Sequence, residues 1–265
     1  MSVLAFRLFG PLAAWGTEEA GETERPTGSH PGRSHIVGLL AAALGLQRTD
    51  EVAQRDLAAG YRFAVAAQGT RQPLRDYRTV QTVEPNRAQR KNGFVSRKHA
   101  LETGAHVHTM ITRRSYLQEG LWRVFAAPRN DSIASPPEAL VEALRAPVFE
   151  LYLGRRDCPP ALPPDPVVLP EGKLETLLAA YPAVPSSLCA PPAPIGLRRL
   201  AGRLARDPVT LTWEPDFPEA PDADIAGVAR RQVADQPLSR SLRRFASREE
   251  LSRSIANPET SQTEG

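Results

Sequence analysis

Apolar and polar residues follow two kinds of period along this chain. Val3 to Phe9 alternate as the residues of a strand do. A helical spacing begins at Ser34, a favoured N-cap, and ends at Leu44 before Gly45, a typical helix stop. In order along the chain, the pattern predicts a strand over 3–9, helices over 34–44 and 50–59, strands over 61–65, 74–83, 109–117 and 121–127, a helix over 135–145 and a strand over 148–153.

This order of elements predicts an α+β fold. With the short second helix set aside, the elements run strand, helix, strand, strand, helix, strand, which is the ferredoxin-like (RRM-like) βαββαβ arrangement of RNA-recognition modules. A polar, basic excursion from Glu84 to about Gly104 interrupts the middle strands. Asn92-Gly93 within it is a strong hairpin-turn signal, so we expect an extended β-hairpin that projects from the domain.

The composition changes after Arg156. Prolines cluster at 159–170, 182–194 and 208–221, which disfavours long helices, whereas Val209 to Trp213 favours a strand. From about Glu249 onward the residues are polar and lack periodicity. We therefore expect a ferredoxin-like domain over 1–156, a smaller, proline-rich β region over 157–248 and a disordered tail over 249–265.

The segment from Leu8 to Leu46 contains a loop that the predicted core does not require. Trp15 and Arg33 belong to this glycine- and proline-bearing loop, and ordering such a loop costs conformational entropy. Something outside the fold is therefore expected to need them. Arg33 and Ser34 would present a charge and a helix N-terminus to a phosphate.

The charge is unevenly distributed. Residues 71–123 contain eleven Lys and Arg but four Asp and Glu, although the whole chain has a net charge of only +3. A segment this basic within an otherwise mildly acidic chain indicates a polyanion site. A solvated basic loop is the plainer alternative.

No sequence pattern indicates a membrane protein or an oxidising compartment. No apolar run approaches the roughly 18 residues of a membrane span. Arg7, Pro11 and Glu18 interrupt the N-terminus early, unlike a signal peptide. Two cysteines in a chain of 265 residues are weak evidence for a disulfide framework, so we expect a cytoplasmic protein.

The chain carries no motif for a metal or a cofactor, and none is expected. His106 and His108 lack a third ligand at suitable spacing. One acid–base set remains: Lys98 and His99, with Tyr77 or Tyr116 expected nearby. Metal-free RNA cleavage can use His, Lys and Tyr, although adjacent Lys and His are common by chance.

Basic and aromatic residues together point more strongly to RNA. Arginine supplies bidentate phosphate contacts and stacks on bases, and tyrosine offers a stacking face with a hydroxyl. Packing within a half-buried sheet is the alternative for the tyrosines. The candidates that lie on the predicted strands or just after them are Arg75, Tyr77, Arg78, Arg113, Arg114, Tyr116, Tyr152, Arg155 and Arg156, and a late cluster adds Arg244 and Arg248.

Six sequence blocks together resemble one known family. They are GPLAAWG at 10–16, RPTGSHPGRSHIVGLLAAALGLQR at 25–48, LRDYRT at 74–79, RRSYL at 113–117, LYLGRRDCP at 151–159 and RRFASRE at 243–249. In this order they resemble the CasD family, subunits of the type I-E CRISPR surveillance complex Cascade, over nearly all of the chain before the tail. The segment 86–108 matches least, because it is longer and more basic than the family implies.

The resemblance implies a fold, partners and a role. It implies a ferredoxin-like domain with a β-hairpin thumb, here about 78–112, and cytoplasmic assembly with the CasC backbone, CasA, CasB and the CasE endonuclease. The subunit would cap the backbone and hold the 5′ handle of the guide RNA (crRNA), and it would meet target DNA through the assembled complex in antiviral defence. The handle-binding candidates that it implies are Trp15, Arg33, Ser34, Arg75, Tyr77, Arg114, Tyr116, Tyr152, Arg155 and Arg156.

Three hypotheses follow from the sequence. The first is a non-catalytic guide-RNA-binding subunit, in which CasE cuts the precursor. The second is a metal-independent endoribonuclease acting on CRISPR repeat RNA through Lys98 or His99. The third is a free-standing RNA-binding protein.

Overall fold

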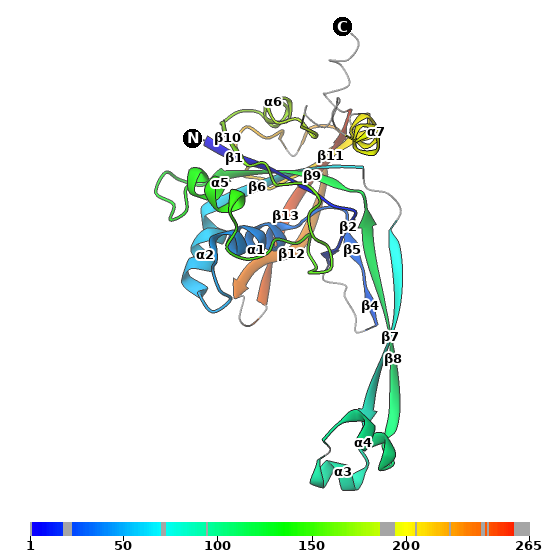
Figure 1. Ribbon diagram of the computed structural model, residues 1–265. Coiled ribbons are helices and arrows are strands. Elements are labelled where there is room, and N and C mark those ends of the chain that lie inside the picture. The colour runs from blue at the N-terminus through cyan, green and yellow to red at the C-terminus, as the bar shows by residue number, and fades with distance from the viewer. Residues whose placement is uncertain are drawn as a thin grey trace.

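The central feature of the computed structural model is a seven-stranded antiparallel sheet (Figure 1). The residues described are 2–17, 23–69, 73–93, 95–185, 194–204, 206–222, 224–239, 242 and 244–256. The strands lie in the order β10-β1-β9-β6-β11-β13-β12. Their bounds are β1 Ser2–Phe9, β6 Tyr61–Gln68, β9 Leu121–Pro128, β10 Val167–Pro170, β11 Val209–Trp213, β12 Ala229–Ser239 and β13 Arg244–Ile255. The expected mixture of helices and strands is confirmed.

Helices cover both faces of this sheet. On one face lie α1 (Arg33–Leu44), α2 (Glu51–Gly60) and α5 (Pro137–Arg145), and on the other α6 (Leu174–Ala180) and α7 (Ile195–Leu204). In β1, Phe6 and Leu8 pack under α1, whereas Val3 and Ala5 pack under α6. Successive side chains of a strand point to opposite faces, so β1 is apolar almost throughout because both of its faces are buried. None of the described helices is long and apolar enough to span a membrane.

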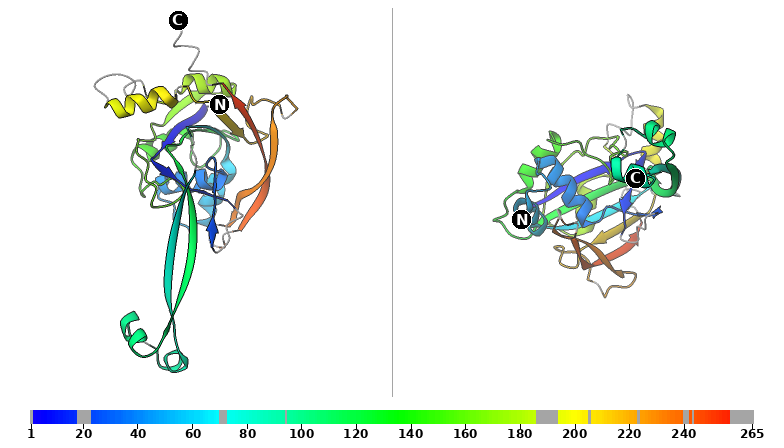
Figure 2. Two further views of the ribbon diagram at one scale, coloured as in Figure 1. Left: turned by 90° about the vertical axis from the view of Figure 1, so that its right-hand side faces the viewer. Right: turned by 90° about the horizontal axis from the view of Figure 1, so that it is seen from below.

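A long two-stranded ribbon projects from the body (Figures 1 and 2). It consists of β7 (Leu74–Glu84) and β8 (His106–Gln118), which pair without interruption from their root at the body to the tip. The expected projecting hairpin is therefore present, and it extends beyond the predicted limits of 78–112. Two short helices, α3 (Arg87–Asn92) and α4 (Arg97–Glu102), form the tip.

The tip corrects the expected tight turn at Asn92-Gly93. The side chain of Asn86 accepts a hydrogen bond from the backbone N–H of Gln89 (2.9 Å) and so caps α3. The buried Gln89 side chain donates to the carbonyl of Ala100 (2.7 Å) and to the hydroxyl of Thr103 (2.6 Å). These bonds join α3 to α4 and satisfy polar groups that a tight hairpin would leave in water, so local capping prevails over the turn signal.

The strand predicted at 148–153 is wrong. The backbone N–H groups of Val148 and Phe149 donate to the carbonyls of Ala43 and Ala42, each at 3.1 Å. The last carbonyls of a helix have no partner within it, so this segment caps α1 instead of joining the sheet. β10 takes the edge position beside β1, with its Leu169 opposite Val3.

The C-terminal region shares the main sheet with the N-terminal region and forms no separate one. β11 pairs with β6, where Trp213 lies opposite Ala64, and β13 pairs with β11. The tail predicted from residue 249 is therefore wrong for 249–255, which belong to β13. Leu251 is buried in the core there, and this burial stabilises a strand whose polar face gave no sequence signal. Residues 257–265 lie outside the described part of the chain.

Four short strands bring the opening loop to the root of the ribbon. They are β2 (Leu12–Ala13), β3 (Trp15–Gly16), β4 (Glu24–Arg25) and β5 (Thr27–Gly28). β2 and β4 both pair with β8, and β3 pairs with β5. The loop thus contacts the basic part of β8.

Candidate nucleic-acid interface

One face of the ribbon presents a tyrosine between two arginines. Residues opposite each other on antiparallel strands share a face, and Tyr77 lies opposite Arg113. Arg75 stands two residues from Tyr77 and therefore shares that face. All three are exposed, although the guanidinium of Arg113 lies 3.4 Å from the carboxylate of Glu24. Two cations beside an open aromatic ring suit a phosphate strand with a stacked base.

Tyr116 joins the opposite face of the ribbon to the segment after α5. The guanidinium carbon of Arg155 lies 4.9 Å from the centre of the Tyr116 ring, and Arg78 donates to the Tyr116 hydroxyl (3.2 Å). Arg78 also pairs with Asp76 and lies 3.7 Å from the carboxylate of Asp157. Tyr116 is itself 3% exposed, so it holds the two arginines in place and has no free face for a base.

The segment 152–156 is fixed against the body by its backbone. Gly154 has φ +83°, and a Cβ there would overlap the carbonyl oxygen of Ala14, so only glycine fits this crossing. Arg155 donates to the carbonyl of Arg25 (3.4 Å), on the strand that runs beside Arg114. Arg156 is open to solvent, and among the described residues its ion pair is with the exposed Glu150 carboxylate at 3.7 Å.

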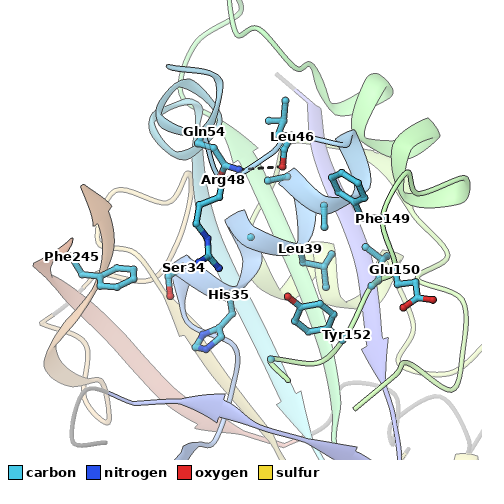
Figure 3. A pocket seen from close by; sticks show the side chains of 15 residues that line it. Ser34, His35, Leu39, Leu46, Arg48, Gln54, Phe149, Glu150, Tyr152 and Phe245 are labelled. Atoms are coloured by element: carbon cyan, nitrogen blue, oxygen red, sulfur yellow. Dashed lines mark hydrogen bonds between the residues drawn. The ribbon is translucent and has the colours of Figure 1, made fainter. Parts of the chain in front are cut away.

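A cleft of about 400 Å³ opens between α1 and the segment after α5 (Figure 3). Tyr152 and Phe245 stand on its two sides, 44% and 42% exposed. Ser34 and His35 lie between these two rings, and Arg48 points toward the same space. The cleft therefore combines two open aromatic faces with polar groups, as a site for a nucleobase requires.

Two residues of this cleft, His35 and Arg48, were not singled out from the sequence. Both lie within the block at 25–48 that carries the family resemblance. His35 occupies the first turn of α1, and Arg48 follows the end of that helix. Only the resemblance could have marked them, because nothing in the helical pattern shows that Tyr152 and Phe245 lie across from them.

Trp15 corrects the expectation that the core does not need it. Its side chain is 2% exposed, and its ring packs edge to face on Trp122 (5.1 Å between centroids) and on His35 (5.6 Å). The ring is therefore part of the core and has no face open to a ligand. Its contribution to the cleft is to position His35.

Arg33 is likewise internal. It is 4% exposed, forms an ion pair with the buried Glu214, and its guanidinium lies 5.2 Å from the centre of the Phe63 ring. Asp235 of β12 accepts a hydrogen bond from the Arg33 backbone N–H (2.6 Å). A carboxylate of the protein thus already occupies the N-terminus of α1, so the phosphate site expected at Arg33 and Ser34 is not open.

Arg248 belongs to the same internal network. It lies 2.6 Å from a carboxylate oxygen of Asp235 and 3.0 Å from one of Glu250, which also contacts His30 at 3.3 Å and Arg231 at 2.8 Å. Burial acts to raise the pKa of Glu250, but the hydrogen bond to His30 and the charges of His30 and Arg248 lower it to about 2. Arg244, by contrast, is exposed on β13. The network ties the β12–β13 hairpin to α1.

The groups considered for RNA cleavage are not assembled. Lys98 and His99 belong to α4 at the tip, where the Lys98 ammonium lies 3.9 Å from Glu102. Tyr77 and Tyr116 lie near the root, and the seven residues from Tyr77 to the outer end of β7 span about 23 Å at 3.3 Å per residue. The two pairs cannot act on one bond. Within the described ranges, no cluster of three His, Cys, Asp or Glu residues is placed to hold a metal ion.

The fold is that of CRISPR-associated proteins. A solved structure described as "CRISPR RNA-guided surveillance complex" contains a chain with TM-score 0.59 and 23% identity, over 96% of this chain and 90% of that one. A second, "Crystal structure of Cas protein", has TM-score 0.52 and 26% identity, over 97% of this chain and 96% of that one.

The family model "CRISPR-associated protein (Cas_Cas5)" matches residues 3–249, so the chain belongs to this family. The protein "CRISPR system Cascade subunit CasD" of Escherichia coli (strain K12) is 33% identical over 168 residues, which are 60% of this chain and 67% of that protein. The resemblance to CasD drawn from the six blocks is confirmed.

Proposed function

We propose that this protein is the CasD subunit of a type I-E Cascade complex, where it holds the 5′ handle of the crRNA and does not cut RNA. The observation that carries the proposal is that Arg78 of the ribbon and Arg155 of the 152–156 segment both contact Tyr116. Because Tyr152 of the same segment lines the cleft, these contacts join the ribbon root to the cleft. Membership of the Cas5 family and similarity to CasD support the assembly.

An RNA strand has a continuous path on this surface. Bases would stack on Tyr152 and Phe245 in the cleft, where each stacked base contributes roughly 1–3 kcal/mol. Arg156 would leave its exposed partner Glu150 for a phosphate at little cost, because surface ion pairs are worth about 1 kcal/mol or less. Arg78, on the same face of the ribbon as Tyr116, would take the strand onward, and Arg75 and Tyr77 would contact guide RNA that lies over the other face.

The ribbon would act as a thumb laid over the guide near the start of the spacer. Its tip is basic, because Arg87, Arg90 and Lys91 lie in α3 and further basic residues lie in α4. We interpret β10-β1-β9-β6 with α1 and α5 as the ferredoxin-like part that supports the thumb. The remaining partners would be CasC, CasA, CasB and CasE in the cytoplasm, with target DNA bound through the complex.

The test is guide retention in the purified complex. Tyr152→Ala and Arg156→Ala remove exposed side chains, so both variants should fold and assemble. We expect less crRNA per particle than in the wild type, and for Arg156→Ala a difference from the wild type that is largest at low salt, because the variant has lost a salt-sensitive phosphate contact. Arg145→Ala is the matched control, because it removes an exposed arginine of α5 that pairs with Glu142 at the surface. Wild-type guide content in both test variants would refute the proposed site.

A further inference from the structure

A second basic surface lies on α7 and at Arg206 just beyond its end, away from the candidate interface. The described carboxylates leave Arg198, Arg199 and Arg206 without an ion pair. Many exposed arginines elsewhere are paired, for example Arg145 with Glu142 (3.0 Å), Arg156 with Glu150 (3.7 Å) and Arg230 with Asp224 (2.6 Å). Adjacent unpaired cations repel one another, so their concentration on α7 and directly after it calls for an anionic partner.

The helix is firmly anchored beside the root of the ribbon. Leu204 packs in a cluster with Phe9 and Leu121, and its carbonyl accepts a hydrogen bond from the Gln68 side chain (3.0 Å). Arg203 pairs with Glu119 in the turn between β8 and β9 (2.9 Å). This cluster lies on the sheet face opposite α1, and both views place α7 on the side of the body away from the ribbon tip (Figures 1 and 2). The surface is therefore separate from the cleft.

Gly202 provides a second, independent observation. A glycine in a helix interior costs about 1 kcal/mol relative to alanine. A Cβ at Gly202 would meet no described atom within 4 Å, and the same holds for Gly196 at the start of the helix. Neither residue has the positive φ that favours glycine. Packing among the described residues therefore does not explain these glycines. A ligand backbone that approaches the helix closely would explain them, because a larger side chain would block it.

We propose that α7 binds the phosphate backbone of double-stranded DNA. Arg198 to Arg203 span about 8 Å of helix at 1.5 Å per residue, roughly two phosphates of one DNA strand at 3.4 Å each. The sequence of α7, IGLRRLAGRL, contains no aromatic residue. Single strands are held largely by stacking on aromatic rings, so a surface of arginines and glycines favours a duplex whose bases are already stacked. The binding is expected to be independent of sequence.

The test uses the guide-loaded complex. The inference rests on the proposed function only because this assembled complex is the form of the protein that is tested. The variant is Arg199→Ala/Arg206→Ala, which leaves the Arg203–Glu119 pair intact. The control is Arg55→Ala/Arg145→Ala, two exposed arginines of α2 and α5 on the opposite face. The probe is a labelled 30-base-pair duplex without a match to the guide, titrated at several salt concentrations.

We expect the α7 variant to bind the duplex roughly 10- to 30-fold more weakly at 0.15 M salt. The slope of log affinity against log salt should fall by about 2, since each lost phosphate contact contributes about 0.9. Gly202→Leu should also weaken binding, because it removes the space for a DNA backbone while adding a better helix former. The control should match the wild type.

Four results would overturn the proposal. Unchanged duplex affinity in both α7 variants would do so, as would an equal loss in the control. An equal loss for a single-stranded DNA probe of the same length would rule out the preference for duplex. Loss of crRNA or of another subunit from the α7 variant would assign α7 to the guide or to a protein contact. Guide content in the Tyr152→Ala variant tests the handle site separately.

Discussion

The burial of Arg33 makes a prediction that separates a structural arginine from an RNA-binding one. Arg33 and Glu214 are 4% and 5% exposed, and they form an ion pair within the core. Removing one partner of a buried pair leaves an uncompensated charge, which costs about 3–5 kcal/mol. Glu214→Gln should therefore lower the free energy of unfolding by about that much.

Removing the arginine instead of the carboxylate should lower the free energy of unfolding by less. Arg33→Met leaves Glu214, but that carboxylate keeps Arg129 at 3.4 Å, which is partly exposed to water. Burial already raises the pKa of Glu214 in spite of the opposing charge of Arg33, so the carboxylate can also take up a proton. The double variant Arg33→Met/Glu214→Leu removes both charges, and such replacements are often close to neutral.

Urea denaturation of the full-length chain and its three variants provides the measurement. The double variant should be more stable than Glu214→Gln by at least about 2 kcal/mol, which is a non-additive result. Guide content of the complex should match the wild type in the double variant, because Arg33 is buried in the core. A double variant no more stable than Glu214→Gln would refute the buried-pair argument, and a complex that folds but lacks crRNA would refute the structural assignment of Arg33.

Two further predictions concern pH and catalysis. The pKa of Glu250 is lowered in the folded state to about 2 from an ordinary value of 4.5, so its stabilisation is present above pH 4.5 and is lost as pH falls toward 2; it amounts to about 3 kcal/mol. Urea midpoints at pH 3 and pH 6 should differ less in Glu250→Gln than in the wild type, and an unchanged difference would contradict the assignment. The purified protein incubated with CRISPR repeat RNA in EDTA should give no specific cleavage, because Lys98 and His99 lie at the tip, far from Tyr77 and Tyr116. Specific products that disappear in His99→Ala would establish the endoribonuclease hypothesis instead.

The sharing of one ribbon face by Arg75 and Tyr77 depends on local periodicity alone. Arg75 and Tyr77 share a face because strand residues alternate, and their exposure follows from a ribbon with little packed against it. Trp15 and Arg33 differ, because residue type indicates the chemistry of a side chain and not its depth. Their surroundings come from residues far along the chain, such as Trp122 and Glu214, which no local pattern connects to them.

The identity of the strand at the sheet edge likewise could not be predicted from local sequence patterns. Residues 148–153 and β10 are both short apolar segments, and periodicity does not choose between them. The choice is made by the unsatisfied carbonyls at the end of α1, which Val148 and Phe149 cap. The tip of the ribbon follows the same rule, since the Gln89 hydrogen bonds to α4 replace the expected turn.

By itself, the sequence determined the principal helices, most strands of the main sheet, the projecting basic ribbon and the resemblance to CasD, because these depend on neighbours a few residues apart. The tertiary structure alone decided which basic and aromatic side chains remain at the surface. Arg78, Tyr116 and Arg155 meet at the ribbon root, whereas Arg33 and Arg248 neutralise carboxylates inside the fold. The physical reason is that a charge leaves water only where a distant partner compensates it, and folding alone brings that partner into place.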